Sequence, residues 1–138
     1  MKNLIVSITL LLMAALVSPG FNVAHADSTD GGKLLGKAEV LKLITGNTVK
    51  WTKGAGYYKP DGTLIFKWKG SDGEGKWRVN DEGTECWIVD KWWGGTEKCF
   101  VVWHKKGDEF IVKNTRKNTV THKPNTIFSK GNNLSNYN

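Results

Sequence analysis

The stretch that decides the fold is Glu85–Phe100, "ECWIVDKWWGGTEKCF", in which two cysteines enclose an apolar run, paired tryptophans and paired glycines. Residues 86–91 and 98–104 have the composition of β-strands, and the glycines between them are typical of a chain reversal. The interpretation is a β-hairpin in which Cys86 faces Cys99 and residues 91–94 form the turn. The two cysteines then act as a clamp across the hairpin.

Both faces of this predicted hairpin are apolar. The face shared with the disulfide carries Ile88, Val101 and Trp103, and the opposite face carries Trp87, Val89, Phe100 and Val102. An antiparallel strand pair commonly leaves one face in water. We therefore expect the second face to be covered by a helix, by a curled-over strand or by a partner chain.

The start of the chain predicts export. Lys2 precedes an uncharged apolar run over 4–17, and small residues stand at Ala24 and Ala26. This is the layout of a secretory signal peptide over residues 1–26, cleaved after Ala26, and it predicts a mature protein that is exported to the periplasm or secreted. The apolar run is too short to favour a membrane anchor.

An oxidising compartment favours joining Cys86 and Cys99, the only cysteines of the chain, as a structural disulfide. Closing this loop stabilises the fold by roughly 3 kcal/mol on the chain-entropy model. A redox pair usually has the spacing Cys-x-x-Cys, and a zinc site needs further ligands that His104 and His122 do not obviously supply. We expect neither a metal nor a cofactor.

Removing 26 of the 138 residues leaves 112, enough for one small domain. Removing Lys2 leaves 19 basic against 13 acidic side chains, a net charge of +6. We expect a flexible N-terminus over 27–32, a single domain over 33–128, and a disordered tail over 129–138, because "SKGNNLSNYN" has almost nothing to bury.

Within the domain, the hydrophobic period changes once. The spacing over 34–44 predicts one amphipathic helix, about Lys37–Thr45, ending at Gly46. From Thr48 onward apolar and polar residues alternate, and Pro60-Asp61-Gly62 is a strong turn signal. The pattern predicts a mainly β fold in which the helix precedes an antiparallel meander of six or seven strands. The meander would curl into a half-barrel or a small lipocalin-like barrel, with the helix over one end or face.

The order of these pieces resembles a known family. The segments "AEVLKLITGNTV", "YYKPDGTL" and "GKWRV" precede a Cys-Trp strand, a second Cys strand and "GDEF". Over about 34–120 this order is similar to a small exported bacterial family called domain of unknown function (DUF995). The resemblance implies an exported single domain with a paired-cysteine β-sheet, and it supplies no catalytic residues.

Tryptophan is the most distinctive residue of the chain, with seven copies. Most of those in strand patterns are expected in the core: Trp51, Trp68, Trp77, Trp87 and Trp103. Trp92 and Trp93 are adjacent in the predicted turn, so either at least one of them is exposed or both fold back as a lid over the barrel mouth. With Lys91 and Lys98 they form the candidate ligand-binding residues.

No catalytic constellation is evident, so we expect a binding domain and not an enzyme. A basic exported protein attracts lipopolysaccharide, anionic polysaccharide or an acidic protein surface, and export argues against nucleic acid. The leading hypothesis is binding of an anionic envelope glycan or lipid. The alternatives are a protein–protein module, such as an inhibitor or an envelope-complex subunit, and a small barrel carrying an apolar ligand. For that barrel, large side chains predict a filled interior and not a cavity.

Overall fold

The computed structural model describes residues 32–137, so the predicted signal peptide and residues 27–31 of the predicted flexible N-terminus lie outside it. The described chain forms one antiparallel sheet of ten strands. Its elements in order are β1 (Lys33–Leu34), α1 (Lys37–Ile44), β2 (Asn47–Trp51), β3 (Gly54–Tyr58), β4 (Thr63–Trp68), β5 (Ser71–Val79), β6 (Glu85–Ile88), α2 (Asp90–Trp93), β7 (Lys98–Lys106), β8 (Glu109–Asn114), β9 (Thr119–Pro124), η1 (Asn125–Ile127), β10 (Phe128–Lys130) and η2 (Leu134–Asn136). Within 32–137, no helix has the length and apolar character needed to cross a membrane.

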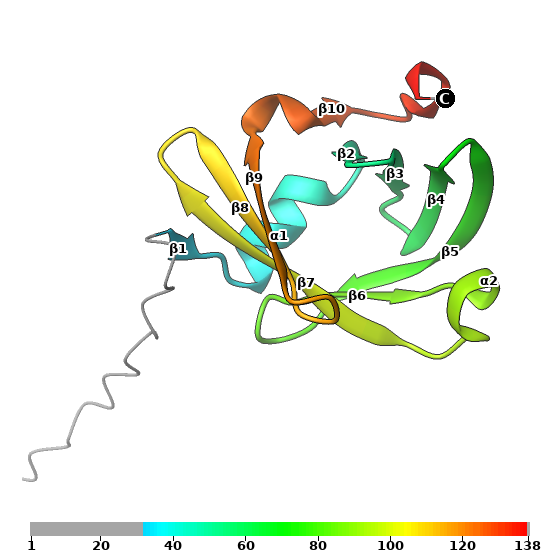
Figure 1. Cartoon of the computed structure of the whole chain (residues 1–138), viewed down its shortest axis with the longest axis horizontal. Helices are drawn as coiled ribbons and strands as arrows, with labels where there is room; N and C mark the ends of the chain where they lie inside the picture. The colour runs from blue at the N-terminus through cyan, green and yellow to red at the C-terminus, as the bar shows by residue number, and fades with distance from the viewer. Residues whose placement is uncertain (1–31, 138) are drawn as a thin grey trace, which may run out of the picture.

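The sheet curls into the predicted half-barrel. Its strand order is β10-β2-β3-β4-β5-β6-β7-β8-β9, with β1 added beside β7. Strands β9 and β10 therefore stand at opposite edges of the sheet although only η1 separates them in sequence. In Figure 1 the strands run round from β2 through β5 and β7 to β9, and β10 returns beside β2.

The prediction of six or seven strands is wrong, because it did not include β1, β3 and β10. Strand β1 has only two residues, and β10 lies in the polar tail. Strand β3 is hidden by its glycines, which remove the side chains that show a period of two. At Gly56 a Cβ atom would lie 2.3 Å from Cζ2 of Trp51, so the indole occupies the missing side chain's space.

The two ends of the half-barrel differ. At one end, the closed end, α1 packs against β2 and β5 and buries Val40 and Ile44 completely. Gly46 follows α1 with φ +72°, the left-handed conformation of a residue that ends a helix. Alternate turns of a meander fall at the same end, so residues 52–53, 69–70, α2 and 115–118 meet at the other, open end.

The predicted disorder of residues 129–138 is contradicted where the structure describes them. The Thr48 hydroxyl donates to the Gly131 carbonyl oxygen (2.6 Å) and accepts the Asn133 N–H (2.9 Å). Leu134 is buried, and β10 pairs with β2. The polar tail is ordered because a buried threonine and the open edge of β2 supply its hydrogen-bond partners.

The hairpin of β6 and β7 keeps its cysteine pairing but not its predicted faces. Cys86 is opposite Cys99, yet Glu85 is opposite Val101, so a β-bulge adds one residue to β7. A bulge shifts the side-chain alternation by one residue. Val101 and Trp103 therefore point into the half-barrel and not to the disulfide's face.

The chain between these strands is also not the predicted tight turn. It forms the single helical turn α2, whose Val89 carbonyl oxygen accepts the Trp93 N–H at 3.0 Å. Gly94 ends it in the left-handed conformation, with φ +58°.

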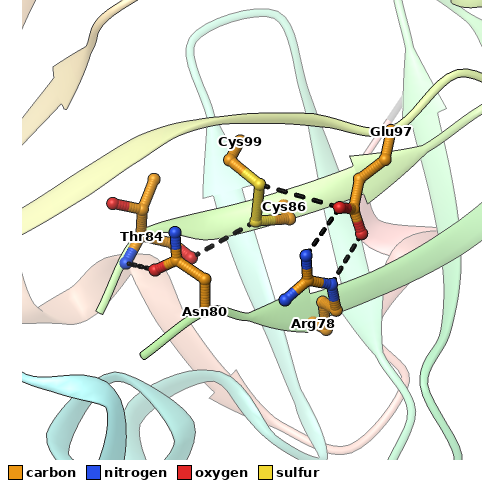
Figure 2. A network of polar contacts seen from close by, with 6 residues as sticks. All are labelled: Arg78, Asn80, Thr84, Cys86, Glu97 and Cys99. Carbon is orange, nitrogen blue, oxygen red and sulfur yellow. Dashed lines mark hydrogen bonds and ion pairs between the residues drawn. A yellow bond between two sulfur atoms is a disulfide. The ribbon is translucent and has the colours of Figure 1, made fainter. Parts of the chain in front are cut away.

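The predicted disulfide between Cys86 and Cys99 is confirmed, and it lies on the outer face of the sheet. Figure 2 shows it between two polar contacts. On one side Arg78 donates two hydrogen bonds of 2.6 Å to the Glu97 carboxylate, and on the other the Thr84 N–H donates to the Asn80 side chain at 2.8 Å. The clamp holds β6 to β7 immediately before the bulge.

We predict that the double substitution Cys86→Ser/Cys99→Ser lowers the free energy of unfolding by about 3 kcal/mol, since the unfolded chain regains the entropy of the open loop. Urea unfolding of the oxidised wild type, the reduced wild type and the double variant measures this loss. The reduced wild type should match the variant. A loss below about 1 kcal/mol in both would contradict the clamp.

Candidate functional site

The interior of the half-barrel holds a cavity of about 680 Å³, which overturns the expectation of a filled interior. We call it the aromatic cup because eight aromatic side chains line it: Trp51, Tyr58, Trp68, Trp87, Trp92, Trp93, Phe100 and Trp103. Six of the seven tryptophans thus face one space. The volume lies within the range of small-molecule sites in proteins.

Aromatic contacts fix the wall of the aromatic cup. Trp51 of β2 stacks on Trp87 of β6 with ring centroids 4.9 Å apart, across the curl of the sheet. Of the three predicted covers for the second apolar face of the hairpin, the structure therefore has the curled-over strand, which is β2. Edge contacts continue from Trp87 to Phe100 at 5.0 Å. Such tilted and edge-on pairs hold rings in defined orientations.

Trp92 and Trp93 lie at the mouth of the aromatic cup, both half-buried. The Trp92 ring packs 4.5 Å from Phe66, and the Trp93 ring packs 5.5 Å from Phe100. The guanidinium of Arg116 lies 4.7 Å from the Trp93 ring centroid, a cation–π contact. Of the two predicted arrangements, the structure has the one in which both indoles fold back over the mouth.

The other two predicted site residues do not join them. Lys91 is exposed on α2 and Lys98 begins β7, and neither is part of the cavity wall. Six other basic side chains surround the aromatic cup, and we call them the rim: Lys50, Lys53, Lys69, Arg116, Lys117 and Lys123. The sequence analysis missed the rim because its members come from separate strands and turns.

A buried carboxyl group forms the floor of the aromatic cup. Glu85 is fully buried, and its Oε1 accepts hydrogen bonds from the Tyr58 hydroxyl and from Nε1 of Trp87, the latter at 2.5 Å. Its Oε2 accepts Nε1–H of Trp103 at 2.9 Å. Glu85 is the one acidic residue of the cavity wall. A buried carboxylate needs such donors because it has lost its water.

Burial raises the pKa of the Glu85 carboxyl, while the hydrogen bonds from Tyr58, Trp103 and Trp87 act in the lowering direction. Burial also raises the pKa of the Tyr58 hydroxyl well above its usual range, and the neighbouring Glu85 charge adds to this rise. The tyrosine therefore keeps its proton and remains a donor to Glu85.

The strand alternation around Trp87 does indicate that Glu85 is buried. An acid two residues before Trp87 in a strand must share the face of that tryptophan. That face was predicted to be apolar, so a buried acid with polar partners followed from the alternation alone. Tyr58 and Trp103, by contrast, have no signal that links them to Glu85.

A group of residue types that can bind metals lies outside the aromatic cup, on the face shown in Figure 2. It contains Cys86, Glu97 and Cys99, whose ligand-type atoms all lie within 4.8 Å of one another. Both sulfur atoms are in the disulfide and offer no thiolate. The Glu97 carboxylate is paired with Arg78, which holds the pKa of Glu97 below its usual value. This cluster is therefore part of the clamp.

The fold and the site define a small antiparallel half-barrel with an aromatic interior open at one end. The chain belongs to the family described as protein of unknown function (DUF995), whose sequence model matches residues 8–128. No curated protein and no solved structure matches the chain.

We predict that the stability of the wild type, relative to a Glu85→Gln variant, falls as pH rises from about 4 to 7. A carboxyl whose folded pKa is raised stabilises the fold fully below its unfolded pKa and loses that contribution as pH rises through the folded value. Urea unfolding of both proteins across this range measures the difference.

A Tyr58→Phe variant is the matched control, because it removes one of the donors that lower the pKa of Glu85. It should enlarge the decline. A wild type whose stability relative to Glu85→Gln rises with pH would show that the three donors outweigh burial, and would reverse the assigned direction.

Proposed function

We propose that this protein is a non-enzymatic binding protein that holds an anionic amphipathic molecule in the aromatic cup. The apolar body of the ligand lies among the tryptophans, and its anionic group lies at the rim. The observation that carries this proposal is a cavity of about 680 Å³ with aromatic walls and a basic mouth in one small domain.

The aromatic wall of the cavity favours a ligand whose body is apolar or flat. Ring faces and edges of six tryptophans offer contact area that would otherwise be hydrated. Burying such area contributes about 25 cal/mol for each Å² removed from water. Such a wall suits an acyl chain or a ring system better than a fully hydroxylated glycan, so among the envelope components first considered a lipid-like molecule is favoured.

The basic residues of the rim favour a ligand that carries a negative charge. All six rim residues are basic, whereas the single acid of the cavity wall, Glu85, is buried at the floor. An anion at the mouth would meet attraction from several sides, and this attraction should weaken with salt because the rim is in water.

The test compares three probes with the same twelve-carbon chain but different headgroups: dodecanoate, dodecanol and dodecyltrimethylammonium, each kept monomeric. We expect a saturable change in tryptophan emission that is strongest for dodecanoate and weakens with salt, because the rim attracts only the anion. Dodecanol should bind more weakly, and the cation most weakly. Absence of binding by all three would overturn the proposed function.

Two neighbouring positions on β9 provide a matched pair of variants. Thr121 lines the aromatic cup, whereas Val120 is 42% exposed. Thr121→Trp should fill the cavity and weaken dodecanoate binding by at least about tenfold, since each excluded methylene forfeits about 0.8 kcal/mol. Val120→Trp adds the same side chain outside and should bind normally. Equal loss in both variants would place the ligand elsewhere.

A further inference from the structure

The two ends of the half-barrel differ in how their charges are arranged. Within 32–137, three of the four ion pairs made by lysine or arginine involve acids at or near the closed end: Lys33–Glu39, Lys37–Asp81 and Lys59–Asp61. The fourth is Arg78–Glu97 on the outer face. Within 32–137, none of the six rim residues forms an ion pair. The rim cations are therefore not held by acidic partners within the described residues.

The rim cations that stand furthest out occupy separate turns. Lys53 lies in the β2–β3 turn, Lys69 in the β4–β5 turn, and Arg116 and Lys117 in the β8–β9 turn. All four are exposed. They come from three separate turns, and together with the half-buried indoles they line the mouth of the aromatic cup. Exposed cations on three turns can contact several headgroups of an extended anionic surface at the same time.

Lys69 adds an independent observation. Its φ is +51°, in the left-handed region where glycine, asparagine and aspartate are the usual residues. A lysine there is less favourable for the fold than asparagine or glycine would be. Residues kept in uncommon backbone conformations often serve function, and this one presents an ammonium group at the tip of a hairpin at the open end.

An exposed apolar side chain accompanies the cations. Val120 is the exposed large hydrophobic residue among those the structure describes, and it stands two residues after the 115–118 turn. Tryptophan and basic side chains together are typical of the boundary between lipid headgroups and acyl chains. The open end thus combines indoles, an exposed valine and cations that form no ion pair among the described residues.

We propose that the open end of the half-barrel docks onto the surface of an anionic phospholipid bilayer, with the mouth of the aromatic cup against the lipid headgroups. Basic side chains near an anionic leaflet each add to the attraction, and the indoles enter the interface. This docking is separate from ligand binding inside the aromatic cup. It would allow an amphipathic ligand to pass between bilayer and cavity without crossing water.

The experiment is co-sedimentation with vesicles of phosphatidylcholine alone and of phosphatidylcholine with phosphatidylglycerol, at low and physiological salt. The rim variant is Lys53→Glu/Lys69→Glu/Lys117→Glu. The matched control is Lys42→Glu/Lys105→Glu/Lys130→Glu, which changes net charge equally at exposed positions away from the mouth. We expect the wild type to bind only the anionic vesicles, and less tightly at the higher salt.

The rim variant should lose at least about tenfold in vesicle affinity, and the control no more than about twofold. Equal losses in the two variants would mean that net charge alone drives binding, and would overturn the docking surface. Undiminished binding by the rim variant would overturn it too. If a soluble acidic polysaccharide binds in preference to the vesicles, the rim belongs to a glycan and the bilayer is excluded.

A single substitution separates docking from folding. Asparagine tolerates the left-handed conformation, so Lys69→Asn should leave the free energy of unfolding equal or higher while weakening vesicle binding. Equal vesicle binding by Lys69→Asn and wild type would remove Lys69 from the docking surface. The Thr121→Trp variant distinguishes the two proposals, because it should lose dodecanoate but keep vesicle binding.

Discussion

The structure depends on one buried carboxyl group and the donors that surround it. Glu85 lies at the centre of the molecule, where an unpaired charge would cost several kcal/mol. Its partners come from three strands: Tyr58 from β3, Trp87 from β6 and Trp103 from β7. The polar edges of these rings must therefore turn towards one point, and the sheet that carries them must curl.

This arrangement also explains how a small domain keeps an aromatic interior partly empty. A ring held by a hydrogen bond at its polar edge cannot rotate to fill neighbouring space. Trp87 and Trp103 are held in this way, and Trp51 stacks on the first of them. The network thereby keeps the interior less densely packed and leaves a cavity whose wall has a fixed shape. An apolar residue in place of Glu85 would remove that restraint on the rings.

The fold could be predicted where it follows from local pattern. The Pro60-Asp61-Gly62 turn, the cysteine pairing and the curl of a β-meander all follow from residue spacing. The bulge in β7 could not be predicted, because one extra residue leaves the composition unchanged and yet reverses the faces of the residues that follow it in β7. Strand β10 was missed for another reason, since its partners at Thr48 and β2 lie far back in the chain.

The candidate site, like the fold, could be predicted only in part. Trp92 and Trp93 were identified because they are adjacent, and adjacency is visible in sequence. The rim and the floor are assembled by topology: Glu85 meets a tyrosine 27 residues away and a tryptophan 18 residues away. Nothing local marks Lys53, Lys69 and Lys117 as neighbours around one opening. Residues brought together by alternate turns of a meander are found only when the strand order is known.

The run from β9 to β10 has a consequence for how the molecule assembles. The chain pairs with β8 in β9 and, after the turn η1, pairs with β2 in β10, so residues 119–130 connect the two edges of the sheet. The Thr48–Gly131 hydrogen bond spans 83 residues, and contacts of such long range form slowly. During synthesis, β2 gains its partner strand only after residues 128–130 have been made. A chain truncated before β10 would expose that edge to other strands and would be prone to aggregate.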